Sequence, residues 1–262
     1  MAREPKTKIW VISVPTAEAR RSDFVRCAGG AEWEFYAAHT GLDANLVYDE
    51  ASTVGRFGRK LHPGELGCYS SHFSLWRWLL HSQFDQAIVL EDDVVADWKF
   101  LDELRQIDLT QRGIDYLRLF AKMPAPWRPI ASPYLDQYRH LIRFTGYALG
   151  TQAYVVTRAG AERLIRHGAS VEAPVDVYMD RTWDHGLLNL ALYPFPVYER
   201  HQPSSIGESR FGADRHNVST LLRKLEIRNL CARARRRLLL NWSMYGTSPS
   251  SEKALRQRLR RV

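Results

Sequence analysis

The chain has 262 residues, of which 45% are hydrophobic and 25% charged, with 16 Gly and 12 Pro. This composition is typical of a globular protein and excludes disordered, collagen-like and low-complexity chains. No apolar run approaches the roughly 18 residues that a membrane span needs, and the first residues lead into a strand-like segment without the apolar core of a signal peptide. The three cysteines, Cys27, Cys68 and Cys231, are widely spaced and form no CxxC pair, so the sequence supports neither a disulfide framework nor a thiolate metal site. We therefore expect a cytoplasmic protein with no membrane-spanning segment.

Positive charge is concentrated at the C-terminal end. The formal net charge is +8, but residues 221–262 carry +10 and residues 1–220 carry −2. A nucleic-acid groove needs basic residues on the folded body, so this distribution disfavours a nucleic-acid-binding module. It indicates a near-neutral body, residues 1–217, followed by a basic helical extension, residues 218–262.

Hydrophobic patterns in the first half predict strands that alternate with helices. Residues 8–14 form a β-branched and aromatic run closed by Pro15, and a helix is expected to start within residues 17–21. Residues 63–67 read as a turn, residues 70–81 have the apolar spacing of an amphipathic helix, and residues 86–90 form a second buried strand.

The second half continues the alternation. Strands are expected at residues 114–120 and 153–157, a helix at 158–167, and another strand-like run at 191–197. The proline-rich residues 123–133 are expected to form an irregular loop or flap, and basic helices are expected at residues 218–240 and 251–261. The pattern predicts an α/β fold with a mostly parallel central sheet, whose ligand site lies at the carboxyl ends of the strands.

The most informative residues are Glu91, Asp92 and Asp93, which directly follow the second buried strand. Three adjacent carboxylates repel one another, so their placement at a strand end favours a compensating cation, and a hard divalent ion would leave positions open for a diphosphate. A solvated turn or a helix cap remains the alternative for the triplet taken alone.

Other candidate residues surround this motif. His72 is expected at the start of a helix, where backbone N–H groups attract anions, and His201 could supply an imidazole to the cation. Arg20 and Arg21 could contact phosphate. For His72 the alternative is a helix cap or a structural histidine, and for His201 it is a structural histidine. For the two arginines it is a solvated position on a helix surface.

A loop carboxylate could act as a general base. Asp176 lies two residues after Pro174, and Asp180 and Asp184 follow on the same segment, of which residues 175–183 read as one helix. Asp176 and Asp180 would then share a helix face. Capping of that helix is the ordinary role for Asp176.

Six motifs occur together in register and resemble glycosyltransferase family 25, which includes lipopolysaccharide and lipooligosaccharide glycosyltransferases and collagen galactosyltransferases. The resemblance covers roughly residues 8–207 and departs from the family pattern at Ser13 and His62. The motifs that carry it are residues 9–14 with Arg20 and Arg21, residues 61–72 with Leu75 and Trp76, residues 87–94, residues 150–154 with Gly160 and Ala161, residues 174–176, and residues 201–207.

The resemblance implies a GT-A-type nucleotide-sugar-binding fold and an inverting, metal-dependent hexosyltransferase. The donor would be a UDP-sugar, with UDP-galactose first and UDP-glucose second, and the acceptor a cell-surface glycan such as lipopolysaccharide or lipooligosaccharide. It implies Asp176 as the base, Mn²⁺ or Mg²⁺ bound by Asp93 and His201, and donor contacts from Ser13, Arg20, Arg21, Glu65, His72, Glu91, Asp92 and Gln152.

The basic extension lies outside the resemblance. Clustered arginines with interleaved Leu, Trp242 and Tyr245 would suit an anionic lipid surface at the cytoplasmic face of the inner membrane, and a packed helix with a solvated charged face is the alternative. Two other functions stay open: a metal-dependent phosphohydrolase that uses the acidic triplet, which would need a two-metal cluster of carboxylates or histidines, and a nucleic-acid-binding protein that uses the tail.

Overall fold

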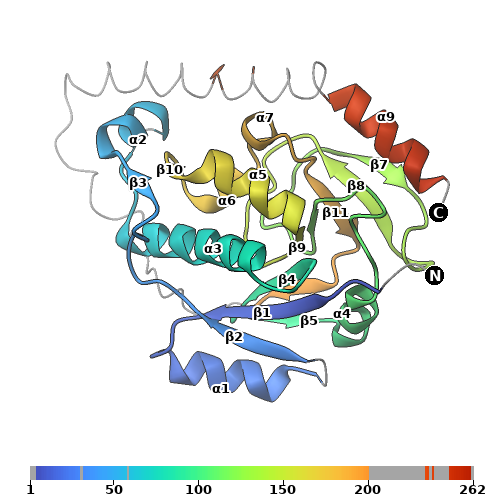
Figure 1. The fold of residues 1–262 in the computed structure, drawn as a ribbon, viewed down its shortest axis with the longest axis horizontal. Coiled ribbons are helices and arrows are strands. Elements are labelled where there is room, and N and C mark those ends of the chain that lie inside the picture. Colours follow the sequence, from blue (N-terminus) through green and yellow to red (C-terminus); the bar gives the residue numbers. More distant parts are fainter. Residues whose placement is uncertain are drawn as a thin grey trace.

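A computed structural model describes residues 4–29, 32–57, 59–200, 234–235, 238 and 248–260 (Figure 1). The helices and strands, in chain order, are β1 (Thr7–Ser13), α1 (Glu18–Cys27), β2 (Trp33–Ala37), β3 (Val47–Tyr48), α2 (Glu50–Phe57), α3 (Pro63–His81), β4 (Gln86–Glu91), β5 (Val94–Ala96), α4 (Trp98–Arg105), β6 (Tyr116–Arg118), β7 (Trp127–Ala131), β8 (His140–Phe144), β9 (Ala153–Thr157), α5 (Arg158–Gly168), β10 (Ser170–Val171), α6 (Val175–Met179), α7 (Thr182–His185), β11 (Leu190–Tyr193), β12 (Val197–Glu199) and α9 (Ser248–Leu259).

The central sheet has eight strands in the order β2-β1-β4-β9-β6-β11-β8-β7. Six of them run in one direction, while β9 and β8 run against their neighbours. The predicted α/β class is confirmed, and the sheet is mostly parallel in strand direction. Only three of the seven pairings are parallel, however, because each reversed strand lies between two strands of the other direction.

Helices cover both faces of this sheet (Figure 1). On one face, Ala87 and Val89 of β4 pack in a core with α3, α5 and α6. On the other, Ile88 and Leu90 pack in a core with α1 and α4. Burial on both faces is the reason that β4 reads as an unbroken hydrophobic run.

Helix α3 begins seven residues before the predicted start, and residues 63–67 are helical rather than a turn. Pro63 occupies the first helical position, where its missing N–H costs nothing. His62 caps the helix because its Nδ1 accepts from the Gly64 N–H at 3.2 Å, and the Glu65 carboxylate accepts from the His62 N–H at 2.9 Å. The ring nitrogen of His62 thus provides the capping acceptor at this N-terminus.

Two further predictions are corrected. Residues 127–131, expected within a loop, form the edge strand β7, which tolerates Pro129 because it pairs with β8 alone. The single helix expected over residues 175–183 is two short helices, α6 and α7, because the chain leaves helical geometry at Arg181, whose ψ is 65°.

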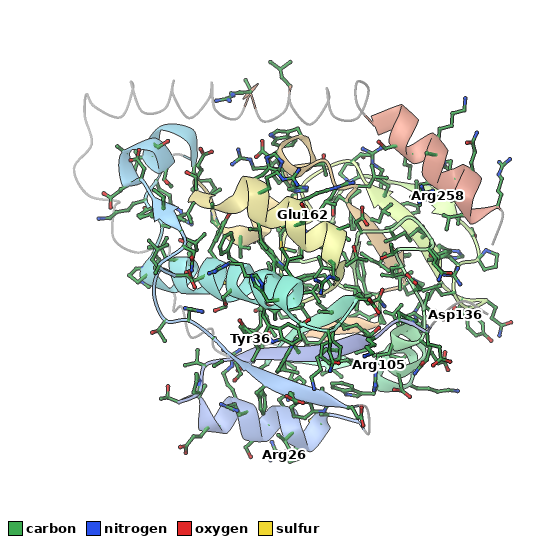
Figure 2. The ribbon with its side chains drawn as sticks, in the orientation of Figure 1. Arg26, Tyr36, Arg105, Asp136, Glu162 and Arg258 are labelled. Atoms are coloured by element: carbon green, nitrogen blue, oxygen red, sulfur yellow. The ribbon has the colours of Figure 1, made fainter. Side chains whose placement is uncertain are left out.

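The last described helix, α9, packs on the body. Leu255 is 3% exposed and joins the core with α1 and α4, and the Glu252 carboxylate accepts from Arg143 at 2.9 Å and pairs with Arg128 at 2.8 Å. Arg258 also lies on α9 (Figure 2). The packed-helix alternative therefore holds for residues 248–260, whereas the helix expected at 218–240 and the domain boundary at 217/218 lie outside the described residues.

Candidate active site

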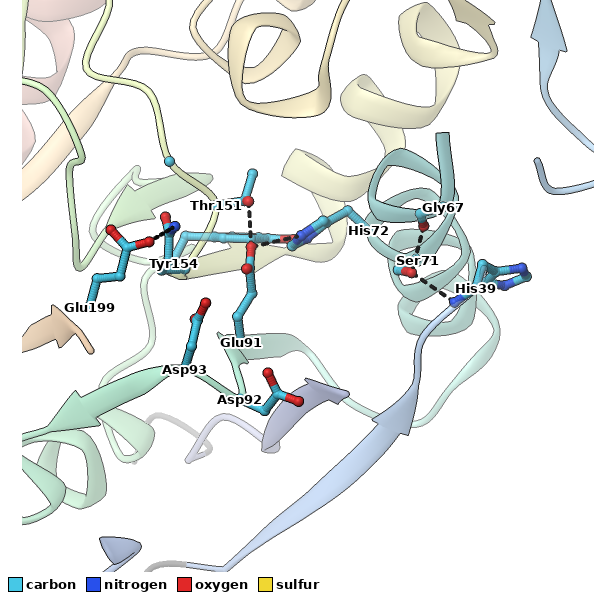
Figure 3. A network of polar contacts seen from close by, with 12 residues as sticks. His39, Gly67, Ser71, His72, Glu91, Asp92, Asp93, Thr151, Tyr154 and Glu199 are labelled. Atoms are coloured by element: carbon cyan, nitrogen blue, oxygen red, sulfur yellow. Dashed lines mark hydrogen bonds and ion pairs between the residues drawn. The ribbon is translucent and has the colours of Figure 1, made fainter. Parts of the chain in front are cut away.

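The acidic motif lies where β4 ends, and its three carboxylates point in different directions (Figure 3). Residues from the neighbouring elements surround it: Ser13 ends β1, Arg20 lies on α1, and Gln152 directly precedes β9. All three are among the donor contacts that the family resemblance implies. The structure brings them together beside the motif, as expected for residues at one edge of a sheet.

Asp92 is held in place from two sides. The Ser13 hydroxyl donates to Asp92 Oδ2 at 2.7 Å, and Arg20 donates to Oδ1. Asp92 is only 5% exposed, so these bonds compensate the burial of its charge. Arg20 Nη2 also lies 3.4 Å from Asp93 Oδ2 and therefore ties α1 to both aspartates.

Asp93 is the member of the motif with spare coordinating capacity. Its Oδ1 is buried and has no hydrogen-bond partner among the residues that the structure describes. Burial, followed by the negative charge of Glu91, raises the pKa of Asp93 to about 7. Asp92 and Glu199 act in the same direction, and Arg20 opposes them. A carboxylate in this position favours a bound cation, which would stabilise its ionised form.

Glu91 points toward α3. Burial opposes ionisation of Glu91, but contacts with His72 and Thr151 outweigh it and lower the pKa. The Thr151 hydroxyl donates to Glu91 Oε1, and His72 Nε2 lies 3.5 Å from the same oxygen. His72 Nδ1 lies 2.9 Å from the Tyr154 hydroxyl, which also accepts from Trp76 at 2.9 Å.

The location of His72 differs from the prediction. It lies in the middle of α3 rather than at its start, so the backbone N–H groups of a helix N-terminus are not beside it. From this position its ring still contacts the carboxylate of Glu91. Close packing nearby depends on Gly67, where a Cβ would lie 2.6 Å from the His39 carbonyl oxygen (Figure 3).

Gln152 connects the motif to Glu199, which sequence reasoning missed. Gln152 Nε2 donates to Glu199 Oε1 at 3.2 Å, and Lys122 donates to the same oxygen at 2.8 Å. Glu199 ends β12, which pairs with β5 directly after the acidic motif. The sequence signal was its place two residues before His201, at the end of a strand-like run.

The loop before β9 requires glycine at position 150. Gly150 has a φ of +82°, and a Cβ there would lie 2.6 Å from Gln152 Oε1. We expect Gly150→Ala to lower the free energy of unfolding by about 1–2 kcal/mol, the usual cost of a left-handed conformation for a residue with a Cβ. Urea denaturation measures this. Gly41→Ala is the control, because a Cβ at Gly41 meets nothing within 4 Å; equal losses in the two variants would contradict the argument.

Two predicted donor contacts have other described partners. Glu65 is 4% exposed and accepts two bonds of 2.7 Å from Arg59 in addition to its cap to His62. Arg21 stacks on the Phe35 ring at 4.1 Å and lies 3.5 Å from the Pro15 carbonyl oxygen. The structure gives both residues structural contacts, and their contact with a donor stays a prediction.

The candidate bases are separated by the structure. Asp176 lies near the start of α6 and is half-buried, and its Oδ1 accepts from the Val177 N–H at 2.8 Å. Asp180 is 1% exposed, and its carboxylate accepts from Arg118, Asn189 and the Leu149 N–H, each at 2.7 Å. Asp180 is thus committed to a buried network and not available as a base.

Asp184 pairs with Arg181 at 2.6 Å on α7. Asp176 therefore remains the best placed of the three. Burial lowers the pKa of Arg118, but the negative charges of Asp180 and, more weakly, Asp176 raise it above its usual value, so Asp176 lies within electrostatic range of Arg118. His201, the second predicted metal ligand, lies outside the described residues.

Comparison with known proteins gives a family. The model of "Glycosyltransferase family 25 (LPS biosynthesis protein)" matches residues 6–179. The chain is 31% identical over 131 residues to the "Probable inactive glycosyltransferase 25 family member 3" of Rattus norvegicus, which covers 48% of this chain and 22% of the relative. It is 26% identical over 151 residues to procollagen galactosyltransferase 1 of Danio rerio, which covers 56% and 23%.

The alignments span about a fifth of the length of these curated relatives. Among solved structures, A197 from STIV aligns with a TM-score of 0.42 and 14% identity over 75% of this chain and 86% of that chain. A glycosyltransferase involved in the glycosylation of the major capsid of PBCV-1 aligns with a TM-score of 0.31 and 14% identity over 60% and 62%. The family match extends from the start of β1 through α6 and contains the acidic motif with the residues that hold it, so the chain belongs to glycosyltransferase family 25.

Proposed function

We propose that this protein is an inverting, metal-dependent glycosyltransferase that moves a hexose from a UDP-sugar to a cell-surface glycan such as lipopolysaccharide or lipooligosaccharide. The observation that carries the proposal is Asp93 Oδ1 at the carboxyl end of β4. It is buried, the negative charges of Glu91, Asp92 and Glu199 act on it, and it accepts no hydrogen bond from the described part of the chain. Galactose is the first candidate for the transferred sugar and glucose the second, on the basis of the family.

The donor atoms around Asp93 fit a hard divalent ion. They are carboxylate oxygens of Asp93 and of its neighbour Glu199, and such oxygens are the ligands that Mn²⁺ and Mg²⁺ prefer. Asp93 would hold the ion, and His201 remains the proposed second ligand. The bound ion would supply positive charge opposite the leaving diphosphate, which is the main electrostatic demand of glycosyl transfer.

The chain's own residues orient this site. Ser13 and Arg20 hold Asp92, so the turn that carries Asp93 is fixed before any ligand binds. Gln152 and Lys122 fix Glu199 beside it. Such preorganisation keeps the carboxylates in place despite their mutual repulsion and avoids reorganisation during the reaction.

Inversion requires a base on the opposite side of the sugar from the leaving group, and Asp176 is our proposal for it. We expect Asp176→Asn to lower kcat by about 100-fold or more, the size of effect expected when a positioned base is lost. UDP affinity and melting temperature should stay nearly unchanged, because Asp176 is half-buried and the hydrogen bond described for its carboxylate comes from the adjacent Val177 N–H, which asparagine can still accept. Steady-state kinetics and calorimetry measure these quantities, and a near-normal kcat would remove Asp176 from the role.

A donor panel tests the proposed reaction. Purified protein is incubated with Mn²⁺, an oligosaccharide acceptor and each of several nucleotide sugars, and released nucleoside diphosphate is measured. Acceptor-dependent release of UDP from UDP-galactose or UDP-glucose supports the proposal. Hydrolysis of simple phosphoesters without transfer would instead favour the metal-dependent phosphohydrolase.

Membrane docking is a separate proposal for the basic extension. None of the described helices is both long and apolar enough to cross a bilayer. We propose that residues 221–247 bind anionic lipid beside a lipid-linked acceptor at the cytoplasmic membrane face. This segment contains four clustered arginines, Arg233, Arg235, Arg236 and Arg237. Packing of α9 on the body would hold the extension close to the catalytic domain.

A further inference from the structure

Three side chains of the kinds that bind metal ions meet at Glu91, the first residue of the acidic motif, and Asp93 is not one of them. Cys68 and His72 are four residues apart on α3 and therefore share a helix face. With Glu91 at the end of β4, they place a sulfur, an imidazole nitrogen and a carboxylate oxygen within 4.8 Å of one another. The sequence did not predict this group, because its third member comes from a different element.

The separations are close to those of one tetrahedral ion. Ligands about 2.1 Å from zinc at the tetrahedral angle lie about 3.4 Å apart, and a thiolate lies about 3.6 Å from a nitrogen or oxygen ligand. His72 Nε2 and Glu91 Oε1 are already 3.5 Å apart. From the 4.8 Å limit, each distance between the Cys68 sulfur and the other two ligand atoms would have to shorten by up to about 1.2 Å to reach the ideal of about 3.6 Å, a change within the range of a side-chain rotation.

His72 supplies a second, independent observation. Its side chain is fully buried, and the contact described for its Nε2 is the 3.5 Å ion pair with Glu91 Oε1, which is longer than a good hydrogen bond. A buried polar nitrogen in this state requires an explanation. When Nδ1 carries the ring proton and donates to the Tyr154 hydroxyl, 2.9 Å away, the Nε2 lone pair is free to bind a metal ion.

We propose that Cys68, His72 and Glu91 form a binding site for a soft divalent transition-metal ion of the Zn²⁺ class, with a fourth position open to water. Thiolate and imidazole ligands select Zn²⁺ over Mn²⁺ and Mg²⁺, which prefer the oxygen donors at Asp93. Binding deprotonates the Cys68 thiol and releases one proton to solvent. The two sites are distinguished by donor chemistry, and this proposal does not depend on the reaction proposed above.

Cobalt absorption tests the site without changing any of its ligands. The Cys27→Ser/Cys231→Ser variant leaves Cys68 as the only one of the three cysteines. Titration of this protein with Co²⁺ should produce thiolate-to-cobalt charge-transfer absorption in the near ultraviolet with one ion per chain. Addition of Zn²⁺ should displace the cobalt and remove the absorption, whereas Mg²⁺ should not.

Ligand variants complete the test, with thermal melts to confirm that each is folded. Adding Cys68→Ser should abolish the charge-transfer absorption. His72→Gln removes a direct ligand and should weaken Zn²⁺ binding in calorimetry by more than about 10-fold, because loss of a residue that only supports a metal ligand already costs about that much. Absence of the absorption at saturating Co²⁺, or unchanged Zn²⁺ affinity in a folded Cys68→Ser protein, would overturn the proposal.

Discussion

Asp93→Asn is expected to abolish transfer and to remove metal-dependent UDP binding. Asparagine keeps the size of the side chain but lacks the charge that holds a hard cation. Within the described ranges, Oδ1 of Asp93 is the buried carboxylate oxygen of the motif that accepts no hydrogen bond. The measurement is UDP release from the preferred donor with Mn²⁺. Asp102→Asn on α4 is the matched control, because that side chain is 59% exposed and pairs only with Arg105 among the contacts described for it. Full activity of Asp93→Asn in EDTA would contradict the metal role.

The same variant should be more stable than the unaltered protein when no metal is present. The pKa of Asp93 is raised from 3.8 to about 7 in the folded state, so folding is opposed increasingly as pH rises through this interval. The unaltered protein should therefore lose melting temperature between about pH 4 and 7, and Asp93→Asn should lose less. Equal pH dependence of the two proteins in EDTA would contradict the raised pKa.

Asp180→Asn is expected to destabilise the fold by about 3–5 kcal/mol, the usual cost of breaking one partner of a buried ion pair. The Arg118 and Asp180 side chains are 1% and 0% exposed. Asparagine cannot neutralise Arg118, which also donates to the carbonyls of Leu149 and Gly150. Urea denaturation measures the loss. The loop that carries Thr151 to Glu91 should loosen as well, which would appear as faster amide exchange at residues 148–152.

Asp184→Asn is the control for that variant. Its carboxylate also pairs with an arginine, Arg181, but the side chain is 27% exposed, so solvent can replace the lost partner. We expect a loss of about 1 kcal/mol or less. Losses of equal size in the two variants would show that the Arg118 network does not stabilise the fold as argued.

The acidic end of β4 could be predicted from the sequence because its signal is local. A buried strand followed directly by three carboxylates needs no knowledge of distant contacts. Ser13 and Gln152 were expected only through the family resemblance, whose motifs contain them. These residues do lie beside the motif. Their contacts with a donor stay predictions.

Tertiary contacts determined what the sequence could not predict. Asp176 and Asp180 look equivalent at a spacing of four, and only the packing of Arg118 and Asn189 reveals that Asp180 is buried in a network. The predicted start of helix α3 is seven residues late, because Pro63 and Gly64 are typical of a turn while proline is also favoured at the first helical position. That error also misplaced His72.

Long-range strand pairing also determined features that the sequence could not predict. A run such as β9, buried on both faces, gives no indication of its direction, so its antiparallel placement between β4 and β6 could not be anticipated. Glu199 was missed because β12 leaves the central sheet to pair with β5. Only that pairing places it beside Asp93.

The central claim is that the acidic end of β4 holds a divalent ion together with the diphosphate of a uridine nucleotide. Isothermal titration calorimetry of the full chain with UDP, in Mn²⁺ and then in EDTA, tests it most directly. The account predicts one UDP site per chain in Mn²⁺ that is lost in EDTA and lost in Asp93→Asn with Mn²⁺ present. Equal UDP affinity under all three conditions, or no UDP binding alongside tight binding of another nucleotide, would contradict it.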